Sequence, residues 1–378
     1  MGLIGKNSKK NDLVRWKMLI VVRDKEKKMS KESTTETTEE VVVKSNGFTL
    51  DDLMNPTLSR VAKTTDGLVV TIYGYGGLGK TPVAAKMESP YYLAFGKAGV
   101  SGLNNVPVKP IMSWAEFKRF TKTFCDPKNF ETIHSKFKTL ILDEMEVLYK
   151  YCEKYVANSE GVNKIKQGNG GYGLWGDLKD EWETEILKVI GSGFCVMFIL
   201  HTAPTEDGKQ FPVGDVKRML PILINHSDIV GYVIGNGVNQ DTGKPIHSSL
   251  GLAATNEYFA RTRNEYFDPI IEDFTAENLV KAYYDAIDRQ EKAEGVTAVT
   301  KADRDKMFET TKRNFKDVMN DVQEVGAAVI EKYGSKEKLT EIVEDVLGPG
   351  ALVANCTAKQ QEAVEVILDR LKDVLNEE

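Results

Sequence analysis

The feature that most constrains the fold is a glycine-rich stretch in residues 67–86, GLVVTIYGYGGLGKTPVAAK. Residues 68–73 are mostly apolar, β-branched or aromatic and predict a short buried strand, which ends at four glycines within six positions. Residues 74–81, GYGGLGKT, have a glycine, four residues and then Gly-Lys-Thr, the spacing of a loop that surrounds phosphate groups. The alternative is a glycine-rich turn with a chance lysine. The order of strand, loop and helix favours nucleotide binding.

Each part of this phosphate loop, residues 74–81, has a predicted role in binding ATP and Mg²⁺. Glycines let successive backbone N–H groups face phosphate oxygens, and the following helix adds the positive end of its dipole. We expect Lys80 to bridge the β- and γ-phosphates and the Thr81 hydroxyl to bind Mg²⁺. Pro82 fits the first turn of a helix, where its missing N–H has no intrahelical acceptor. The predicted nucleotide-binding residues here are Gly74, Gly76, Gly77, Leu78, Gly79, Lys80, Thr81 and Pro82.

A second motif, KTLILDE in residues 138–144, follows downstream. Residues 139–142 predict a hydrophobic strand that ends in Asp143, the position from which a carboxylate holds Mg²⁺ through its water in phosphate-loop ATPases. Glu144 stands just past the strand end, where we expect it to polarise the hydrolytic water. Any buried strand that ends in an acidic turn looks similar, but the position downstream of a phosphate loop favours the catalytic interpretation.

The composition is that of a globular protein and limits its partners. The 378 residues are 41% hydrophobic and 28% charged, and no run of 18 apolar residues occurs, so we expect no membrane span. Four cysteines without a CxxC pair and four scattered histidines indicate neither a disulfide framework nor a zinc site, which favours the cytoplasm. The net charge is −6, so any binding of nucleic acid depends on local basic patches.

Three regions follow from the distribution of residue types. Residues 1–45 predict a flexible arm, because residues 1–30 carry nine Lys and Arg against three Asp and Glu and a polar run follows. Residues 46–290 alternate predicted strands and helices and form the core. Residues 291–378 are predicted to be an acidic helical region, with helices over 300–334, 336–347 and 357–376. Its apolar helix face fits either the protein's own core or a partner subunit.

Three further residues are candidates for the nucleotide site. His201 follows the most hydrophobic predicted strand, residues 193–200, where it would sense the γ-phosphate; a histidine held by backbone groups is the alternative. Arg261 and Arg263 face the same side of the predicted strand 258–263, because side chains in a strand alternate. One interpretation is that the two arginines complete the nucleotide site of a neighbouring subunit. The alternative is that they are surface residues that contribute only to solubility.

The loop in residues 163–176, NKIKQGNGGYGLWG, combines five glycines with Lys164, Lys166, Tyr172 and Trp175. Lysines contact phosphates and aromatic rings stack on bases, so this loop is a candidate for binding single-stranded DNA. The alternative is a solvated connection whose Trp175 packs back onto the core.

With these motifs placed, residues 66–285 resemble the phage-encoded RecA-like ATPases of the single-strand annealing and recombination type. The resemblance rests on the order of IYGYGGLGKT, VKPIMSWAEFKRF, TLILDE, GLWGDL, FILHTA, HSDIVGYV and FARTR. It implies an α/β fold, namely a RecA-like P-loop core with a mostly parallel central sheet flanked by helices, and a helical C-terminal extension follows this core. The N-terminal arm and the chain after about residue 290 lie outside the resemblance.

The resemblance also implies roles for single residues. It places Lys80 and Thr81 at the phosphates and Mg²⁺, Asp143 at the metal, His201 as sensor, and Arg263 as a nucleotide or interface arginine. Such proteins often have an acidic residue at the end of the second strand, and PYYLAFGKAG has none. Glu144 is therefore the predicted general base, with Glu88 in reserve, and the predicted catalytic residues are Lys80, Glu144 and Arg263.

The function expected from this resemblance is ATP hydrolysis coupled to single-stranded DNA in phage recombination or replication, in the cytoplasm of the bacterial host. We expect a homo-oligomer with the nucleotide at the subunit interface, and a phage or host replication protein as a further partner. Two alternatives stay open. One is a nucleotide-gated scaffold whose acidic helical tail binds a partner, and the other is a replicative helicase or loader motor.

Overall fold

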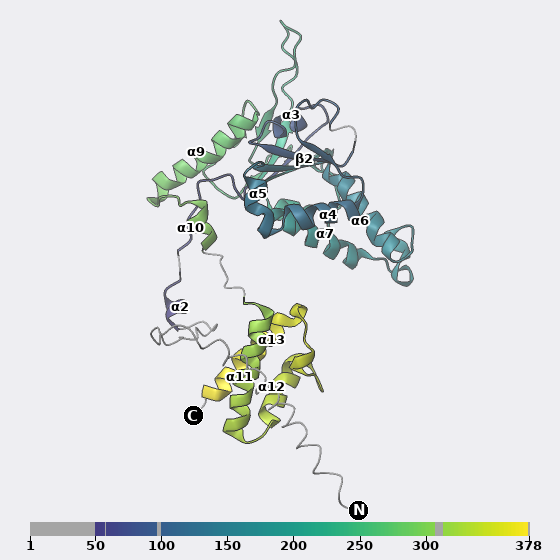
Figure 1. Ribbon diagram of the computed structural model, residues 1–378. Coiled ribbons are helices and arrows are strands. Elements are labelled where there is room, and N and C mark those ends of the chain that lie inside the picture. Colours follow the sequence, from purple (N-terminus) through teal and green to yellow (C-terminus); the bar gives the residue numbers. More distant parts are fainter. Residues whose placement is uncertain (1–49, 57, 97–99, 307–312, 377–378) are drawn as a thin grey trace, which may run out of the picture. The chain divides into compact units, whose positions relative to one another are not determined.

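The computed structural model describes residues 50–56, 58–96, 100–306 and 313–376. The chain divides into two compact units, which we describe separately: the described residues between 57 and 311 form the sheet unit, and residues 313–376 together with 50–56 form the helical unit (Figure 1). The expected boundary near residue 290 therefore lies further along the chain, because α9 (Ala276–Glu294) and α10 (Lys301–Lys306) belong to the sheet unit. The predicted arm, residues 1–45, lies outside the described residues.

A nine-stranded sheet, mostly parallel, is the centre of the sheet unit. Its order is β11-β9-β8-β1-β5-β4-β2-β3, and β10 pairs with β8. The six strands from β8 to β3 run parallel, whereas β9, β10 and β11 pair antiparallel. The strands are β1 (Val69–Tyr73), β2 (Pro90–Ala94), β3 (Val108–Pro110), β4 (Thr139–Asp143), β5 (Cys195–Leu200), β8 (Ile229–Ile234), β9 (Ser249–Gly251), β10 (Arg261–Thr262) and β11 (Ile270–Ile271). The predicted α/β fold with a mostly parallel sheet is confirmed.

Helices cover both faces of this sheet, as the near-continuous apolar strands require. Side chains alternate along β1, so that Val69 and Tyr73 join the core on one face and Val70 and Ile72 join the core on the other. The first face is covered by α4 (Trp114–Phe124), α5 (Phe130–His134), α6 (Met145–Ser159), α7 (Trp175–Ile190) and α8 (Leu220–His226). The second face is covered by α3 (Lys80–Ala84) and α9.

Local sequence signals set the ends of these helices. The Ser113 hydroxyl accepts a hydrogen bond from the Glu116 N–H at 3.2 Å and so begins α4. Thr275 begins α9 in the same way, through the Asn278 N–H at 3.1 Å. A small hairpin of β6 (Thr202–Pro204) and β7 (Gln210–Pro212) follows β5.

The strand register brings the predicted site to one edge of the sheet. Tyr73 pairs with Leu200, and Asp143 pairs with Ile199, so β1, β5 and β4 end side by side. β5 lies between the other two and is completely buried, as expected for the most hydrophobic strand. The segments that follow these strands are the phosphate loop, the turn into α6, and His201. They therefore share the carboxyl edge of the sheet, where ligands bind in α/β proteins.

The helical unit has a hydrophobic core of its own. It consists of α11 (Phe315–Tyr333), α12 (Glu337–Leu347) and α13 (Gln361–Asn376), and α2 (Leu50–Met54) also belongs to this unit. Apolar side chains of all three long helices are buried together, among them Val322, Ile342 and Leu368. The predicted helix over 300–334 is wrong as one continuous element, since α10 and α11 are separate. Within the described residues, no helix is both long and apolar enough to cross a bilayer.

Candidate active site

The phosphate loop leaves β1 and forms an open backbone cradle. Gly77 and Gly79 have φ angles of 80° and 86°, in the left-handed region that favours glycine. A Cβ atom built on Gly76, Gly77 or Gly79 would meet no atom within 4 Å, so the space beside the loop is open. Gly74 lies at the closed end instead, because a Cβ there would lie 3.0 Å from the Val233 carbonyl oxygen.

Lys80 is the first residue of α3 and is buried, with 6% of its surface exposed. Its ammonium donates hydrogen bonds to the carbonyl oxygens of Gly74 and Tyr75, both at 2.8 Å, and so spans the loop. Burial lowers the pKa of Lys80, and the nearby Asp143 carboxylate opposes that shift. The helix has only five residues. The loop amides and the ammonium, rather than a long helix dipole, therefore make this edge attractive to anions.

Thr81 and Asp143 join the two motifs. The Thr81 hydroxyl donates to Asp143 Oδ2 at 2.6 Å, across 62 positions of sequence. The Tyr92 hydroxyl, from β2, donates to the same carboxylate oxygen. Burial raises the pKa of Asp143, while the hydrogen bonds from Thr81 and Tyr92 and the charge of Lys80 lower it. The predicted metal-binding pair thus lies at one point on the carboxyl edge.

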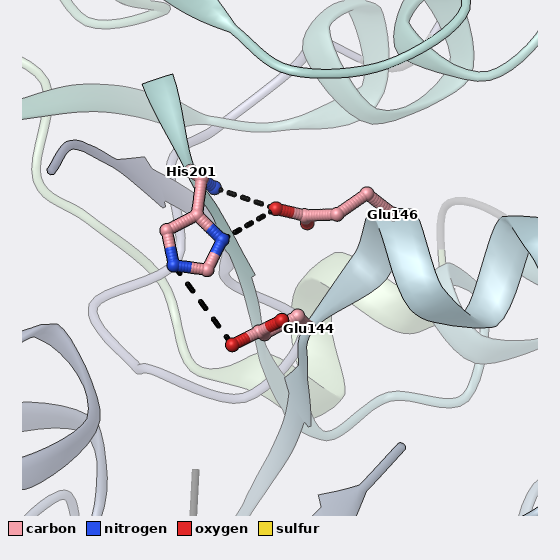
Figure 2. A group of neighbouring side chains, drawn as sticks. All are labelled: Glu144, Glu146 and His201. Atoms are coloured by element: carbon pink, nitrogen blue, oxygen red, sulfur yellow. Dashed lines mark hydrogen bonds and ion pairs between the residues drawn. The ribbon is translucent and has the colours of Figure 1, made fainter. Parts of the chain in front are cut away.

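The residues after β4 and β5 form a second polar cluster (Figure 2). One oxygen of Glu146 accepts hydrogen bonds from His201 Nδ1 at 2.7 Å and from the His201 backbone N–H at 3.0 Å. His201 Nε2 faces the Glu144 carboxylate, with 3.8 Å between Nε2 and Oε1. Burial raises the pKa of Glu144, and the adjacent His201 lowers it. A raised pKa makes a carboxylate a stronger base, which is the direction that favours general-base catalysis.

The remaining residues of the phosphate loop have structural contacts. The Ser248 hydroxyl donates to the carbonyl oxygen of Leu78 at 2.9 Å, and the Leu78 side chain packs beside Gly235. These contacts tie the loop to the segment between β8 and β9. Pro82 is exposed in α3 and leaves the helix intact, as the sequence predicts.

Three predicted residues lie at the opposite, amino edge of the sheet. The Arg263 N–H donates to the Asp228 carbonyl oxygen at 2.9 Å, and Asp228 directly precedes β8. Arg261 pairs with Val230 in the same region. Within one chain, therefore, neither arginine reaches the phosphate loop; a contribution to a neighbouring subunit stays a prediction. Glu88 precedes β2 at this same edge and is exposed, so the reserve assignment as general base is wrong.

The glycine-rich loop of residues 163–176 is partly anchored. Ile165 is buried, and the Arg218 guanidinium lies over the Trp175 ring, 4.4 Å from its centre. Tyr172 has 86% of its surface exposed, and Lys164 is also exposed. Trp175 therefore packs back in part, while the tip of the loop presents an aromatic ring to solvent.

The residues fit Mg²⁺ and a nucleoside triphosphate. The loop is open, Lys80 lies beneath it, and the hydroxyl of Thr81 lies beside the carboxylate of Asp143, the oxygen donors that Mg²⁺ prefers. When bound, Mg²⁺ neutralises the charge that develops on the transferring phosphate.

Two residues of the site were missed from the sequence. Tyr92 stands in an ordinary hydrophobic strand, and only its pairing beside β4 brings its hydroxyl to Asp143. Glu146 stands three residues after Asp143, in the run LDEME, and that third acidic residue was the available signal.

Comparison with known proteins agrees with this geometry. Residues 66–264 match the model of the AAA domain family. Over 326 residues the chain is 44% identical to the SPbeta prophage-derived uncharacterized protein YorG of Bacillus subtilis (strain 168), and the alignment covers 86% of this chain and 99% of that protein. The phosphate loop, the mostly parallel sheet and these two matches together show that the chain belongs to the AAA domain family of P-loop ATPases.

Proposed function

We propose that this protein is a Mg²⁺-dependent, RecA-like ATPase that acts on single-stranded DNA in phage recombination or replication. The observation that carries the ATPase is the 2.6 Å hydrogen bond between Thr81 and Asp143, because it places the phosphate loop and the acidic strand end at one point. Lys80 neutralises charge on the phosphates, and Glu144 takes the proton from the attacking water. His201 faces Glu144 and contacts the terminal phosphate.

Phosphate release from ATP tests this proposal directly. We expect turnover with Mg²⁺ and none after chelation by EDTA, since the carboxylate and hydroxyl at the site need the cation to bind phosphates. The Lys80→Ala protein, purified in the same way, measures contaminating activity. Release from the unchanged protein no faster than from this variant would refute the ATPase.

Support for single-stranded DNA comes from the loop of residues 163–176. Its exposed Tyr172 offers a ring for base stacking, and Lys164 and Lys166 offer charges for phosphates. The molecule carries a net charge of −6, so these contacts must act locally.

Anisotropy of a fluorescent oligonucleotide, measured with Mg²⁺-ATP over a range of salt concentrations, tests this surface. We expect a K164A/K166A variant to bind more weakly and to lower the slope of log K against log salt by about 0.7 for each phosphate that it no longer neutralises. The control variant is K150A/K154A, which removes the same charge from exposed positions of α6. Equal effects in the two variants, or no binding at low salt, would exclude this loop as the DNA site.

Self-assembly is the third part of the proposal. Arg263 has half of its side chain exposed and lies at the sheet edge opposite its own phosphate loop, so any nucleotide it contacts belongs to another subunit. We expect the mass in solution, measured by light scattering, to rise with Mg²⁺-ATP. A monomer under all nucleotide conditions would remove the role of the arginines in trans.

A second candidate function is supported by the helical unit, which we propose binds a phage or host protein. Residues 313–376 bury their own core and carry eight Lys and Arg against twelve Asp and Glu. Between α12 and α13 lies a groove with a cavity of about 460 Å³, lined by the acidic residues Glu341, Glu344, Asp345 and Asp373 together with Lys338, Arg370, Ile342 and Val374. Lys338 pairs with Glu341, and Arg370 pairs with Asp345. Slow ATP turnover that single-stranded DNA does not change would favour this nucleotide-gated scaffold.

A further inference from the structure

Glu146 is the first acidic residue of α6, and its side chain points at the residue that follows β5 (Figure 2). A single oxygen, Oε1, accepts both the ring Nδ1–H and the backbone N–H of His201, at 2.7 and 3.0 Å. Two hydrogen bonds to one oxygen hold the end of β5 and the plane of the imidazole ring together. The geometry is therefore that of an orienting group and not of an isolated surface ion pair.

The donor and acceptor roles follow from the chemistry of the groups. An ionised carboxylate is an acceptor only, so Nδ1 of His201 carries the hydrogen. The other nitrogen, Nε2, then points away from Glu146 and faces Glu144 Oε1 at 3.8 Å. A carboxylate that fixes one ring nitrogen sets both the tautomer and the direction of the other.

We propose that Glu146 is a positioning residue for ATP hydrolysis, which acts through His201 by holding Nε2 toward Glu144 and the space beside it. This inference rests on the proposed ATPase function. It adds Glu146 to the residues that already have a role in that function.

The environment of Glu146 argues against a purely structural role. Its side chain has 12% of its surface exposed, and among the described residues its second oxygen, Oε2, is buried without a hydrogen-bond partner. A buried carboxylate oxygen without a protein partner costs stability, so Oε2 adds nothing to what Oε1 contributes. Among the described residues, the hydrogen bonds of this carboxylate are the two that fix the end of β5 and the ring of His201.

Steady-state kinetics of four variants test the proposal: Glu146→Ala, Glu146→Gln, His201→Ala and the double alanine variant. We expect Glu146→Ala to lower kcat by about tenfold to a hundredfold, the range seen when a group that orients a histidine is removed, with nucleotide affinity changed less than about twofold. Glu146→Gln recovers at least half of that decrease on a logarithmic scale, because its amide oxygen still accepts both N–H groups. We expect the double variant to be no slower than His201→Ala, because the two changes remove the same function, namely the oriented imidazole ring.

Two further measurements keep the test independent of folding and of turnover. The control variant Glu153→Ala removes an acidic side chain two turns along the same helix and leaves kcat unchanged. With ¹⁵N-labelled histidine, NMR reports the tautomer of the ring: we expect His201 protonated at Nδ1 in the unchanged protein and in Glu146→Gln, and a mixture of tautomers in Glu146→Ala.

The possible results separate the two hypotheses. If the unchanged protein hydrolyses ATP and Glu146→Ala matches it, the positioning role is refuted while the ATPase stands. The same follows if the double variant multiplies the two single effects, or if the tautomer does not respond to Glu146. If the unchanged protein releases no phosphate, the ATPase itself fails, and the positioning role fails with it.

Discussion

Tyr92→Phe removes one oxygen from the site and isolates one hydrogen bond. The Tyr92 hydroxyl donates to Asp143 Oδ2, the oxygen that also accepts from Thr81. Burial, together with the negative charge of Asp143, raises the pKa of Tyr92, so the phenol stays protonated and remains a donor. The ring itself is completely buried in β2 and keeps its packing as phenylalanine.

The size of the effect follows from the charge of the acceptor. A hydrogen bond to a charged group contributes about 1.5–3 kcal/mol, and among the described residues the other donor to this oxygen, Thr81, is already in use. For a unit of this size each kcal/mol corresponds to about 2–4 °C, so we expect the melting temperature of the sheet unit to fall by about 3–12 °C.

Tryptophan fluorescence during thermal unfolding measures this unit selectively. Trp114 and Trp182 are buried and stacked in its core, with ring centres 5.6 Å apart. The measurement uses a Trp16→Phe background, because Trp16 is the one tryptophan of the sequence outside residues 57–311. Tyr91→Phe is the matched control. Its ring packs against Phe120 and neighbouring rings, and within the described residues its hydroxyl has no hydrogen bond, so we expect a change below about 0.5 kcal/mol.

The loss of stability caused by Tyr92→Phe should depend on pH, and the direction of that dependence gives a further check. Burial already raises the pKa of Asp143, and removal of the Tyr92 donor raises it further. The penalty of Tyr92→Phe is therefore fully present above both folded-state pKa values and disappears as pH falls below them, because a protonated Asp143 no longer needs a charge-stabilising donor. A penalty equal to that of Tyr91→Phe, or one that is unchanged when Asp143→Asn is added, would refute the reasoning.

Three further predictions concern the site and the helical unit. Lys80→Ala should abolish binding of a fluorescent ATP analogue, because the variant lacks the buried ammonium that spans the loop; affinity within tenfold of the unchanged protein would contradict this. Glu144→Gln should keep that binding and lose phosphate release, since the amide cannot take a proton; full turnover would remove Glu144 as the base. Leu368→Ala should destabilise the helical unit by about 2–5 kcal/mol in calorimetry, because this side chain is 1% exposed, and should leave nucleotide affinity unchanged; a shift in the tryptophan transition instead would show that the two units unfold together.

Most of the fold and half of the site could be predicted from local patterns. The phosphate loop, the strand before it and the acidic end of β4 are contiguous segments, and their spacing alone identifies them. The helix start at Ser113 and the central position of β5 also follow from sequence, because capping and hydrophobicity are local properties. The boundary between the units was harder to place, since α9 and α10 look like other helices until their packing is known.

The rest of the site depends on contacts between distant strands. Tyr92 carries no motif and Glu146 only an added acidic residue in LDEME, and their contacts with Asp143 and His201 appear only when β2 and β5 lie on either side of β4. Arg261 and Arg263 show the opposite case: their local pattern favours a nucleotide site, but β10 contains only Arg261 and Thr262, and its pairing with the start of β8 puts both arginines at the amino edge.

Residue order alone shows that a strand ends in a loop able to hold phosphates, because glycine spacing and backbone conformation are properties of a few consecutive residues. Which side chains surround that loop depends on the folded chain. Strand order and direction set which chain ends meet at one edge, and these depend on long-range pairing that no single segment encodes. The contact of Thr81 with Asp143, and of Glu146 with His201, is the result of that pairing.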